Sequence, residues 1–235
     1  MPDKSPARIQ QMFGAIAPVY DGLNVALSLG IDRWWRRFAA SRLVRPTDQR
    51  ILDVACGTGD LTLALQRQAP PGCRVLGIDF CRPMLVRGRQ KDELPLVWGD
   101  GLRLPFPDAS FDALSIAFGL RNMADRDAGL REMARVLRPG GRLAILEFCL
   151  PANPLVRAGY LAYFRHILPA IGNLVSRSRA YSYLNDSVEQ WPQPRALARI
   201  LRSMGFASVA CWELSLGIAA LHIAQKAPAQ DAPPA

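Results

Sequence analysis

Histidine and paired cysteines are scarce in this chain of 235 residues, and their scarcity narrows the possible functions. Only His166 and His222 are present, so a zinc site, or any other metal site built on histidine, is not expected. The five cysteines are an odd number, and none forms a C-x-x-C pair. This pattern favours reduced thiols in a cytosolic protein over a disulfide framework.

Long apolar segments are also missing. No run of about 18 uncharged apolar residues occurs, so no membrane-spanning helix is predicted. The first 20 residues lack an apolar core segment and a small-residue cleavage site, so no signal peptide is expected. These absences favour a cytoplasmic protein and leave open a peripheral contact with a membrane.

Acidic residues are fewer than basic ones, at 20 against 29, which gives a formal net charge of +9. Lysines account for only three of the basic residues, Lys4, Lys91 and Lys226, and the others are arginines. A basic surface can attract RNA or an anionic membrane, and an ordinary solvated surface rich in arginine is the alternative. Hydrophobic residues make up 50% of the chain, which is enough for one large α/β core.

The segment Arg50-Ile-Leu-Asp-Val-Ala-Cys-Gly-Thr-Gly-Asp60 organises the rest of the chain. Its first half is a short apolar run that predicts a buried strand, and helical spacing of apolar residues begins at Leu61. Gly57 and Gly59 indicate a tight turn between the two, where the backbone turns sharply or a ligand comes close. A strand, a glycine turn and a helix N-terminus together form a site for a nucleotide-like ligand.

The spacing of this turn distinguishes between two kinds of ligand. A dinucleotide-binding turn of the form G-x-G-x-x-G requires a third glycine, and this chain has Thr62 there. Asp60 at the start of the helix would repel a pyrophosphate, which favours a ligand without phosphate. A nicotinamide-dependent oxidoreductase is therefore disfavoured, and a structural turn without a ligand is the remaining alternative.

Strands alternate with helices after residue 50, which predicts a mostly parallel, doubly wound sheet of seven strands with helices on both faces. The expected strands cover 51–55, 74–78, 95–98, part of 104–117, 142–148, 206–212 and 218–225, and the expected helices cover 60–68, 83–89, 125–137 and 194–204.

The first 45 residues precede this alternation and are predicted to be mainly helical. Apolar residues recur at helical spacing over 8–17, and a turn is expected at 20–24. A further helix is expected to begin at Asp32, its predicted N-cap. Trp34 and Trp35 in that helix are expected to pack on the core, and a membrane–water interface is the alternative.

A second helical region, residues 152–190, follows the fifth strand. We expect it to be an insertion that covers the ligand edge of the sheet as a lid. Residues 1–227 are expected to form one domain, and 228–235, rich in proline and alanine, to be a disordered tail.

Polar residues follow the predicted strands at the edge where open α/β sheets bind ligands. Asp79 ends the second strand, and an ionised carboxylate there can accept hydrogen bonds from both hydroxyls of a ribose. Asp100 follows the third strand and either binds an adenine amino group or is an ordinary turn residue. Phe118-Gly-Leu-Arg-Asn122 follows the fourth strand.

Several motifs accompany the glycine turn. They are Ala17-Pro-Val-Tyr-Asp21 with Asn24, Ser28-Leu-Gly-Ile31, Asp53-Val-Ala-Cys-Gly-Thr-Gly-Asp60, Leu104-Pro-Phe106, Phe118-Gly-Leu-Arg-Asn122, Arg135-Val-Leu-Arg-Pro-Gly-Gly-Arg142 and Tyr181-Ser-Tyr-Leu184 with Ser187-Val188. Together they resemble the UbiE-type C-methyltransferases of ubiquinone and menaquinone biosynthesis, over almost the whole chain. The glycine turn is common to many methyltransferases, whereas the segments at 118–122 and 181–184 are far more specific.

The resemblance implies a class I methyltransferase of Rossmann-like fold, with S-adenosylmethionine as cofactor and a prenylated quinol as substrate. Many members carry a serine where this chain has Ala117, so a hydroxyl contact to the cofactor is missing. The expected cofactor-binding residues are Thr58, Asp79, Asp100 and Gly101, together with Asp53, Gly57 and Gly59 of the turn.

The implied chemistry asks for particular groups. A ring carbon attacks the methyl group more readily once a phenol has lost its proton, so a nearby cation and a base, direct or through water, would help. Arg121 is the expected cation, and a salt bridge at the strand end is the alternative role. Tyr20 and Asn122 are expected to position the ring. Alignment alone supplies much of such a rate.

Other functions fit parts of this pattern. A methyltransferase of another small molecule or lipid, or a protein that binds the cofactor without catalysis, would share the glycine turn. A nucleic-acid methyltransferase fits the positive charge, but the Pro-Pro-Tyr motif and the Pro-Cys nucleophile of those enzymes are missing. Nucleic acid is therefore not an expected partner. Homodimerisation and the choice between a benzoquinol and a naphthoquinol ring stay open.

Overall fold

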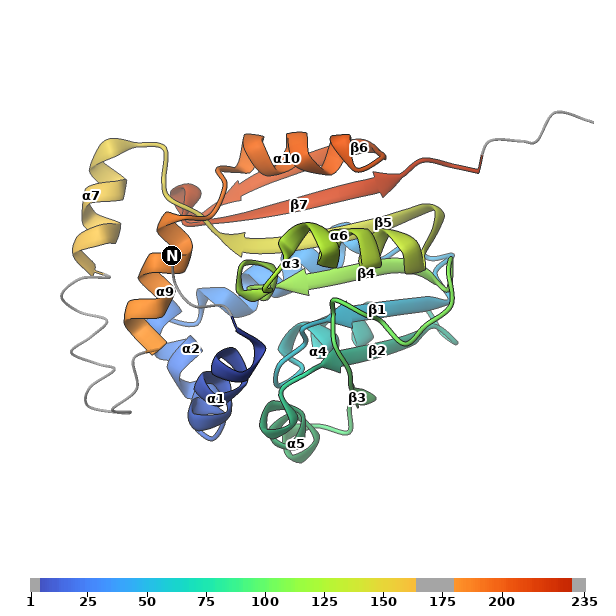
Figure 1. Cartoon of the computed structure of the whole chain (residues 1–235), viewed down its shortest axis with the longest axis horizontal. Helices are drawn as coiled ribbons and strands as arrows, with labels where there is room; N and C mark the ends of the chain where they lie inside the picture. The colour runs from blue at the N-terminus through green and yellow to red at the C-terminus, as the bar shows by residue number, and fades with distance from the viewer. Residues whose placement is uncertain (1–4, 164–179, 230–235) are drawn as a thin grey trace, which may run out of the picture.

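The computed structural model describes residues 5–163 and 180–229 of the chain. Among them, seven strands form one sheet with the order β3-β2-β1-β4-β5-β7-β6 (Figure 1). β1 to β5 pair in parallel, and β7 is antiparallel to both β5 and β6. The strands are β1 (Arg50–Val54), β2 (Arg74–Asp79), β3 (Leu96–Trp98), β4 (Phe111–Ala117), β5 (Leu137–Phe148), β6 (Phe206–Leu214) and β7 (Ala219–Lys226). The predicted seven-stranded, mostly parallel sheet is confirmed.

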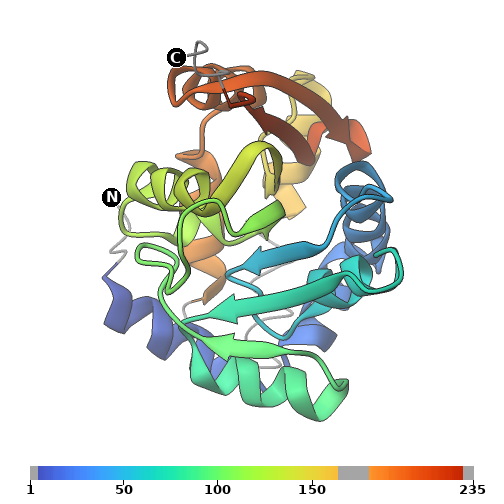
Figure 2. The same cartoon turned by 90° about the vertical axis from the view of Figure 1, so that its right-hand side faces the viewer.

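Helices cover both faces of this sheet (Figures 1 and 2). They are α1 (Pro6–Ile16), α2 (Tyr20–Ser28), α3 (Ile31–Leu43), α4 (Asp60–Gln66), α5 (Arg82–Lys91), α6 (Arg126–Val136), α7 (Pro154–Ala162), α9 (Ala180–Glu189) and α10 (Pro194–Ser203), with short 3-10 helices η1 (Leu120–Asn122) and η3 (Ser215–Gly217). Leu130 of α6 and Leu197 of α10 belong to the core on one face, and Trp35 of α3 and Leu61 of α4 to the core on the other. The central strands are largely apolar because both faces are buried, with Asp53, Ser115 and Glu147 as buried polar exceptions.

The carboxyl ends of the parallel strands point toward α1, α2, α7 and α9 (Figure 1). β1 lies between β2 and β4, with Val54 opposite both Ile78 and Ile116. The strand order reverses at β1, and a crevice at such a switch point is the usual ligand site of open α/β sheets. The four helices therefore lie over the edge at which a ligand is expected.

Three predictions for the N-terminal region are wrong. The turn expected at 20–24 is the first half of α2, where the Leu23 amide donates to the Val19 carbonyl at 2.9 Å. α3 begins at Ile31 with Gly30 as its N-cap, so Asp32 lies within the first turn and does not cap the helix. Trp35 is buried as expected, at 3% exposure, but Trp34 is 52% exposed. Tertiary packing explains the first difference, because α2 packs over the sheet edge and forms a helix despite Gly22.

The helical region at 152–190 is described only at its two ends, as α7 and α9. Residues 164–179, and with them His166 and the middle of the expected lid, lie outside the described residues, as do 230–235 of the expected tail. No helix in the described parts of the chain is long and apolar enough to cross a membrane.

Candidate active site

The glycine turn at the end of β1 has a strained backbone. Ala55 (φ 52), Gly57 (φ 57) and Gly59 (φ 82) all adopt left-handed conformations, which an alanine rarely does. A Cβ atom on Gly59 would lie 2.5 Å from Leu94 Cδ1, whereas one on Gly57 would meet nothing within 4 Å. Gly59 is therefore closely packed against Leu94, whereas the space beside Gly57 is open. Backbone strain of this kind concentrates at functional sites.

Asp53 lies in β1, just before this turn, and its carboxylate oxygens are used inside the protein. Thr62 Oγ1 donates to one oxygen and Ser115 Oγ to the other, each at 2.7 Å. Burial raises the pKa of Asp53 to about 6, although these two hydrogen bonds oppose the shift. Thr62, which replaces the third glycine of a dinucleotide turn, thus ties α4 to β1. Asp53 supports the turn while also lining a small cavity beside it.

Asp79 at the tip of β2 meets the turn directly. The amide of Gly57 donates to one carboxylate oxygen and the amide of Cys81 to the other, both at 2.8 Å. Burial raises the pKa of the Asp79 carboxyl, and these backbone hydrogen bonds lower it. The pairing of β2 with β1 places Asp79 next to Gly57.

Asp100 and Gly101 follow β3 at the same edge. Asp100 is exposed, and its Oδ1 accepts a hydrogen bond from the amide of Leu102 at 2.9 Å, as in a turn. A Cβ on Gly101 would lie 2.7 Å from Met123 Cε and 3.2 Å from Val54 Cγ1. Glycine thus lets this loop lie close to the end of β1 without displacing Met123 or Val54.

Helix α2 lies against the glycine turn through contacts that the sequence did not suggest. Thr58 Oγ1 donates to Asp21 Oδ1 at 2.6 Å, and Lys91 pairs with Asp21 at 3.2 Å and also with Asp60. We call these four residues the α2 latch. A cavity of only about 30 Å³ remains beside the turn.

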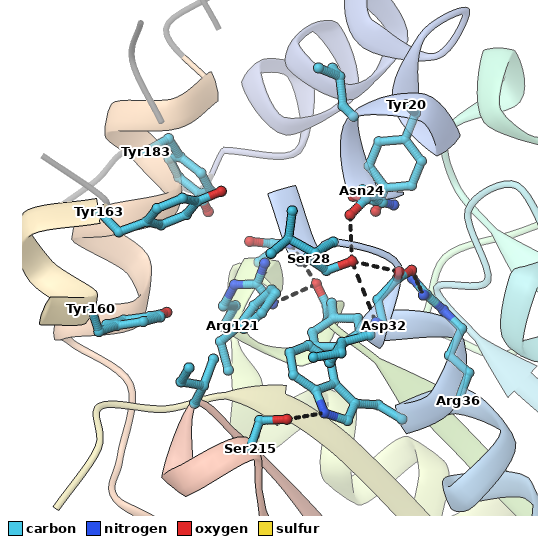
Figure 3. Close-up of a pocket in the computed structure, with 18 of the residues that line it drawn as sticks. Tyr20, Asn24, Ser28, Asp32, Arg36, Arg121, Tyr160, Tyr163, Tyr183 and Ser215 are labelled. Carbon is cyan, nitrogen blue, oxygen red and sulfur yellow. Dashed lines mark hydrogen bonds and ion pairs between the residues drawn. The ribbon is translucent and has the colours of Figure 1, made fainter. Parts of the chain in front are cut away.

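A much larger cavity of about 490 Å³ lies next to the turn, between the sheet edge and the helices that cover it (Figure 3). Tyr20 and Arg36 line both cavities, so the two adjoin at these side chains. The wall is largely apolar, with Phe13, Ile16, Leu23, Trp35, Phe118 and Phe148. Its polar residues are Tyr20, Asn24, Ser28, Asp32, Arg36, Arg121, Asn122, Tyr160, Tyr163, Tyr183 and Ser215.

Arg121 lies in the wall of this cavity and is 5% exposed. Its Nη1 pairs with Glu147 at 2.5 Å and donates to the Phe118 carbonyl at 2.9 Å, and its backbone amide donates to Glu147 at 3.2 Å. The salt bridge that the sequence left as an alternative is therefore present. Its Nε atom is buried without a hydrogen-bond partner among the described residues. Glu147, at the end of β5, was not predicted.

Two asparagines in the same wall also carry unpartnered atoms. Asn122 Nδ2 donates to the Phe118 carbonyl at 3.1 Å, and this contact orients its Oδ1, which is buried without a partner in the described chain. Asn24 Nδ2 is buried in the same state. A buried polar atom without a partner costs about 1–3 kcal/mol. Arg121 Nε thus offers one donor and Asn122 Oδ1 one acceptor to a ligand, whereas Asn24 lies close enough to the Tyr20 phenol to hydrogen-bond with it.

Tyr20 lies beside Asn24 in this cavity (Figure 3). Burial raises the pKa of the Tyr20 phenol, and the positive charges of Arg36 and Arg121 oppose the shift. The structure therefore brings all three expected catalytic residues, Tyr20, Arg121 and Asn122, to one cavity.

Arg36 and Asp32 form a buried ion pair that the sequence analysis missed. Ser28 Oγ donates to Asp32 Oδ1 at 2.6 Å, and the Arg36 guanidinium lies 5.3 Å from the ring centre of Phe118. The four-residue spacing of Asp32 and Arg36 places them on one face of α3 and was the available signal. Across the described residues, no group of three or more His, Cys, Asp or Glu residues could hold a metal ion.

Comparison with known proteins identifies the family. The model of the ubiE/COQ5 methyltransferase family matches residues 1–226. The demethylmenaquinone methyltransferase of Deinococcus radiodurans is 49% identical over 230 residues, which covers 95% of this chain and 94% of that protein. The ubiquinone/menaquinone biosynthesis C-methyltransferase UbiE of Geobacter sulfurreducens is 43% identical, covering 93% and 88%.

Among solved structures, a putative methyltransferase of Haloferax volcanii, in complex with a methyltransferase activator, matches with a TM-score of 0.66. It is 19% identical and covers 92% of this chain and 97% of its own, so it supports the fold alone. The motifs, the sheet topology and the relatives agree. This chain belongs to the ubiE/COQ5 methyltransferase family.

Proposed function

We propose that this chain transfers a methyl group from S-adenosylmethionine to a ring carbon of a prenylated quinol, in menaquinone or ubiquinone biosynthesis. Family membership supports the reaction. The observation that carries the assignment of ligands is the pair of adjoining cavities, one polar at the glycine turn and one apolar of about 490 Å³. The polar side suits the cofactor and the apolar side suits the ring and the prenyl tail.

The residue types at the turn fit the cofactor, which supplies an electrophilic methyl group on a sulfonium sulfur. Asp79 would hold the ribose hydroxyls, Asp100 and Gly101 the adenine, and the turn residues, Asp53, Gly57, Thr58 and Gly59, the remainder. Asp53, Gly57 and Thr58 line the cavity of about 30 Å³, whereas Gly59, Asp79, Asp100 and Gly101 do not. This cavity is smaller than a nucleoside, so we infer that the α2 latch opens when the cofactor binds. Asp21 then releases Thr58.

Arg121, Asn122 and Tyr20 act on the ring in this proposal. Asn122 Oδ1 accepts a hydrogen bond from the ring hydroxyl, and Arg121 Nε donates to the oxygen that becomes a phenolate. Glu147 neutralises the Arg121 guanidinium, so stabilisation comes from the directed Nε–H rather than from a net positive charge. An arginine guanidinium already carries its proton and cannot accept another, so water takes the phenolic proton in this proposal.

The helices outside the sheet complete the site. Tyr160 of α7 and Tyr183 of α9 line the large cavity, which supports a covering role for the region at 152–190 within a single domain of residues 1–227. The aromatic wall of Trp35, Phe118 and Phe148 packs against the ring and the first units of the tail.

The test uses purified protein, labelled S-adenosylmethionine and two reduced substrates with short tails, demethylmenaquinol and 2-polyprenyl-6-methoxy-1,4-benzoquinol. We expect label in the ring of at least one of them. Binding of the cofactor with no label in either quinol would refute the proposed substrate class and favour another methyl acceptor or a non-catalytic role.

A further inference from the structure

The pentapeptide Leu-Ser-Leu-Gly-Ile occurs twice in the sequence, at residues 27–31 and 214–218. The two copies are far apart in the chain, yet Ser28 of the first and Ser215 of the second line the same large cavity (Figure 3). The indole nitrogen of Trp35 donates to Ser215 Oγ at 3.0 Å, which connects α3 to the second copy. Two segments of identical sequence therefore border one cavity.

Both copies place leucine where glycine is usual. Leu29 (φ 52) and Leu216 (φ 59) have left-handed backbones, and each precedes a left-handed glycine. Leu29 ends α2, and its amide donates to the Val25 carbonyl, in the position where helices favour glycine. A left-handed leucine carries a backbone strain that glycine would avoid.

The two leucines are also exposed, Leu29 at 87% and Leu216 at 77%. Both the backbone strain and the exposure of an apolar side chain are unfavourable. At 87% and 77% exposure, the two leucine side chains gain little from burial that could compensate for these costs. Ile31 at 43% and Trp34 at 52% continue the apolar surface along the start of α3. We call Leu29, Ile31, Trp34 and Leu216 the leucine rim. Residues that combine these two costs mark a functional surface.

The charges around the leucine rim are mainly positive. Arg33 and Arg37 are exposed on α3, and the guanidinium of Arg42 lies over the ring of Trp212 at 5.5 Å. Two acids lie nearby. The Glu213 carboxylate lies 3.4 Å from the Cβ position of Gly217, and Asp60, which pairs with Lys91, is within electrostatic reach of Arg33. A second copy of this chain would bring like charges together, whereas an anionic lipid surface complements them.

We propose that the leucine rim docks on a lipid bilayer that contains anionic headgroups, so that the large cavity opens toward the membrane. Leu29 and Leu216 enter the acyl boundary, Trp34 lies at the interface, and Arg33 and Arg37 contact the headgroups. This inference rests on the proposed function, because a prenylated quinol is itself dissolved in the bilayer.

Vesicle binding tests this surface without any substrate. The double variant Leu29→Gly with Leu216→Gly removes both side chains, and glycine accepts the left-handed backbone, so the melting temperature is expected to stay equal or rise. Cosedimentation is measured with vesicles of phosphatidylcholine alone and of an equimolar mixture with phosphatidylglycerol. The wild type is expected to bind the mixed vesicles, and the double variant to bind them at least about tenfold more weakly. Val86→Ser, at an exposed position of α5, is the control and should bind like the wild type.

A second measurement uses Leu216→Gly alone, because Leu216 does not line the cavity. Methylation of a long-tailed quinol in mixed vesicles is expected to fall severalfold, while that of a short-tailed quinol in solution is unchanged. Wild-type protein that ignores vesicles, or a double variant that binds them equally, overturns the inference. A change from dimer to monomer without loss of vesicle binding assigns the leucine rim to a dimer interface and also overturns it. Failure of the wild type to methylate either quinol refutes the proposed function and leaves the vesicle result standing.

Discussion

The glycine turn and the large cavity adjoin, but the turn is formed by residues close together in the sequence and the cavity by residues far apart. The turn comes from one continuous segment, Ala55 to Gly59, and its main partner, Asp79, lies on the neighbouring strand. The cavity combines Tyr20 of α2, Arg121 of η1, Tyr160 of α7 and Tyr183 of α9. The glycine turn, proposed to bind the cofactor, is thus a local structure, whereas the large cavity, proposed to bind the substrate, depends on tertiary packing.

The largest expected effect would break the substrate side. Glu147→Gln keeps the side-chain shape but leaves the buried Arg121 guanidinium without a counter-charge. The free energy of unfolding is expected to fall by about 3 kcal/mol, as when one partner of a buried pair is lost. Urea denaturation measures this loss. Asp127→Asn, in the partly exposed pair with Arg126, is the control and should cost under about 1 kcal/mol. Equal losses in the two variants would show that the buried pair is not structurally important.

Arg121→Lys tests the same pair through catalysis. Lysine keeps a positive charge opposite Glu147, but it lacks the Nε–H group that has no partner among the described residues. We expect kcat to fall about 100-fold while the cofactor Kd stays unchanged. Arg126→Lys, on the surface of α6, is the matched control. A wild-type kcat in Arg121→Lys would rule out the directed Nε–H as a catalytic group.

The pKa of Asp53 predicts a pH dependence on the cofactor side. Burial raises that pKa from 3.8 to about 6 in the folded chain, so the folded state binds the proton more tightly than the unfolded state. Its contribution to stability is therefore greatest below about pH 4 and is lost as the pH rises through about 6, a change of about 2–3 kcal/mol.

Asp53→Asn removes this group while keeping an acceptor for Thr62 or Ser115. The free energy of unfolding is measured by denaturant titration at several pH values for both proteins. Between pH 4 and pH 7, the free energy of unfolding of the wild type should fall relative to that of the variant, because the wild type must bury an ionised carboxylate at neutral pH. A constant difference over this range would exclude titration of Asp53 in the folded state.

The smallest expected effect concerns the contact between the two regions. Asp21→Asn weakens the α2 latch by removing the charge that pairs with Lys91, a partly exposed contact. In the proposed function the latch opens before the cofactor enters, so S-adenosylmethionine is expected to bind to the variant about two- to fivefold more tightly. Isothermal titration calorimetry measures the Kd, and Glu93→Gln, an exposed acid just beyond α5, is the control. Weaker binding to Asp21→Asn would mean that Asp21 contacts the cofactor itself.

Features formed by residues close together in the sequence could be predicted, whereas most features formed by distant residues could not. The adjacency of Asp79 and the glycine turn follows from an apolar run, two glycines and the usual pairing of successive parallel strands. Glu147 was not predicted, although its position also follows from pairing, because β5 lies next to β4 with Leu146 opposite Ala117. The sequence assigned a turn to 20–24 because Gly22 and Asn24 favour turns, and packing of α2 over the sheet edge outweighed that local preference.

The repeated pentapeptide shows most clearly that contacts between distant parts of the sequence could not be predicted. Residues 214–217 were expected to lie between two strands, with only Ile218 in a strand, and nothing in their sequence indicates that they lie near residues 27–31. The contact between Trp35 and Ser215 exists because α3 packs on the sheet face near the β6–β7 connection.

By itself, the sequence determined the seven-stranded sheet, the glycine turn and the family, because apolar periodicity and turn residues act over a few neighbours. Only the tertiary structure decided that Arg121 is neutralised by Glu147, that α2 closes over Thr58, and that Trp34 faces outward while Trp35 is buried. These outcomes depend on competing packing and desolvation energies between elements distant in the chain, and no local pattern records which of them prevails.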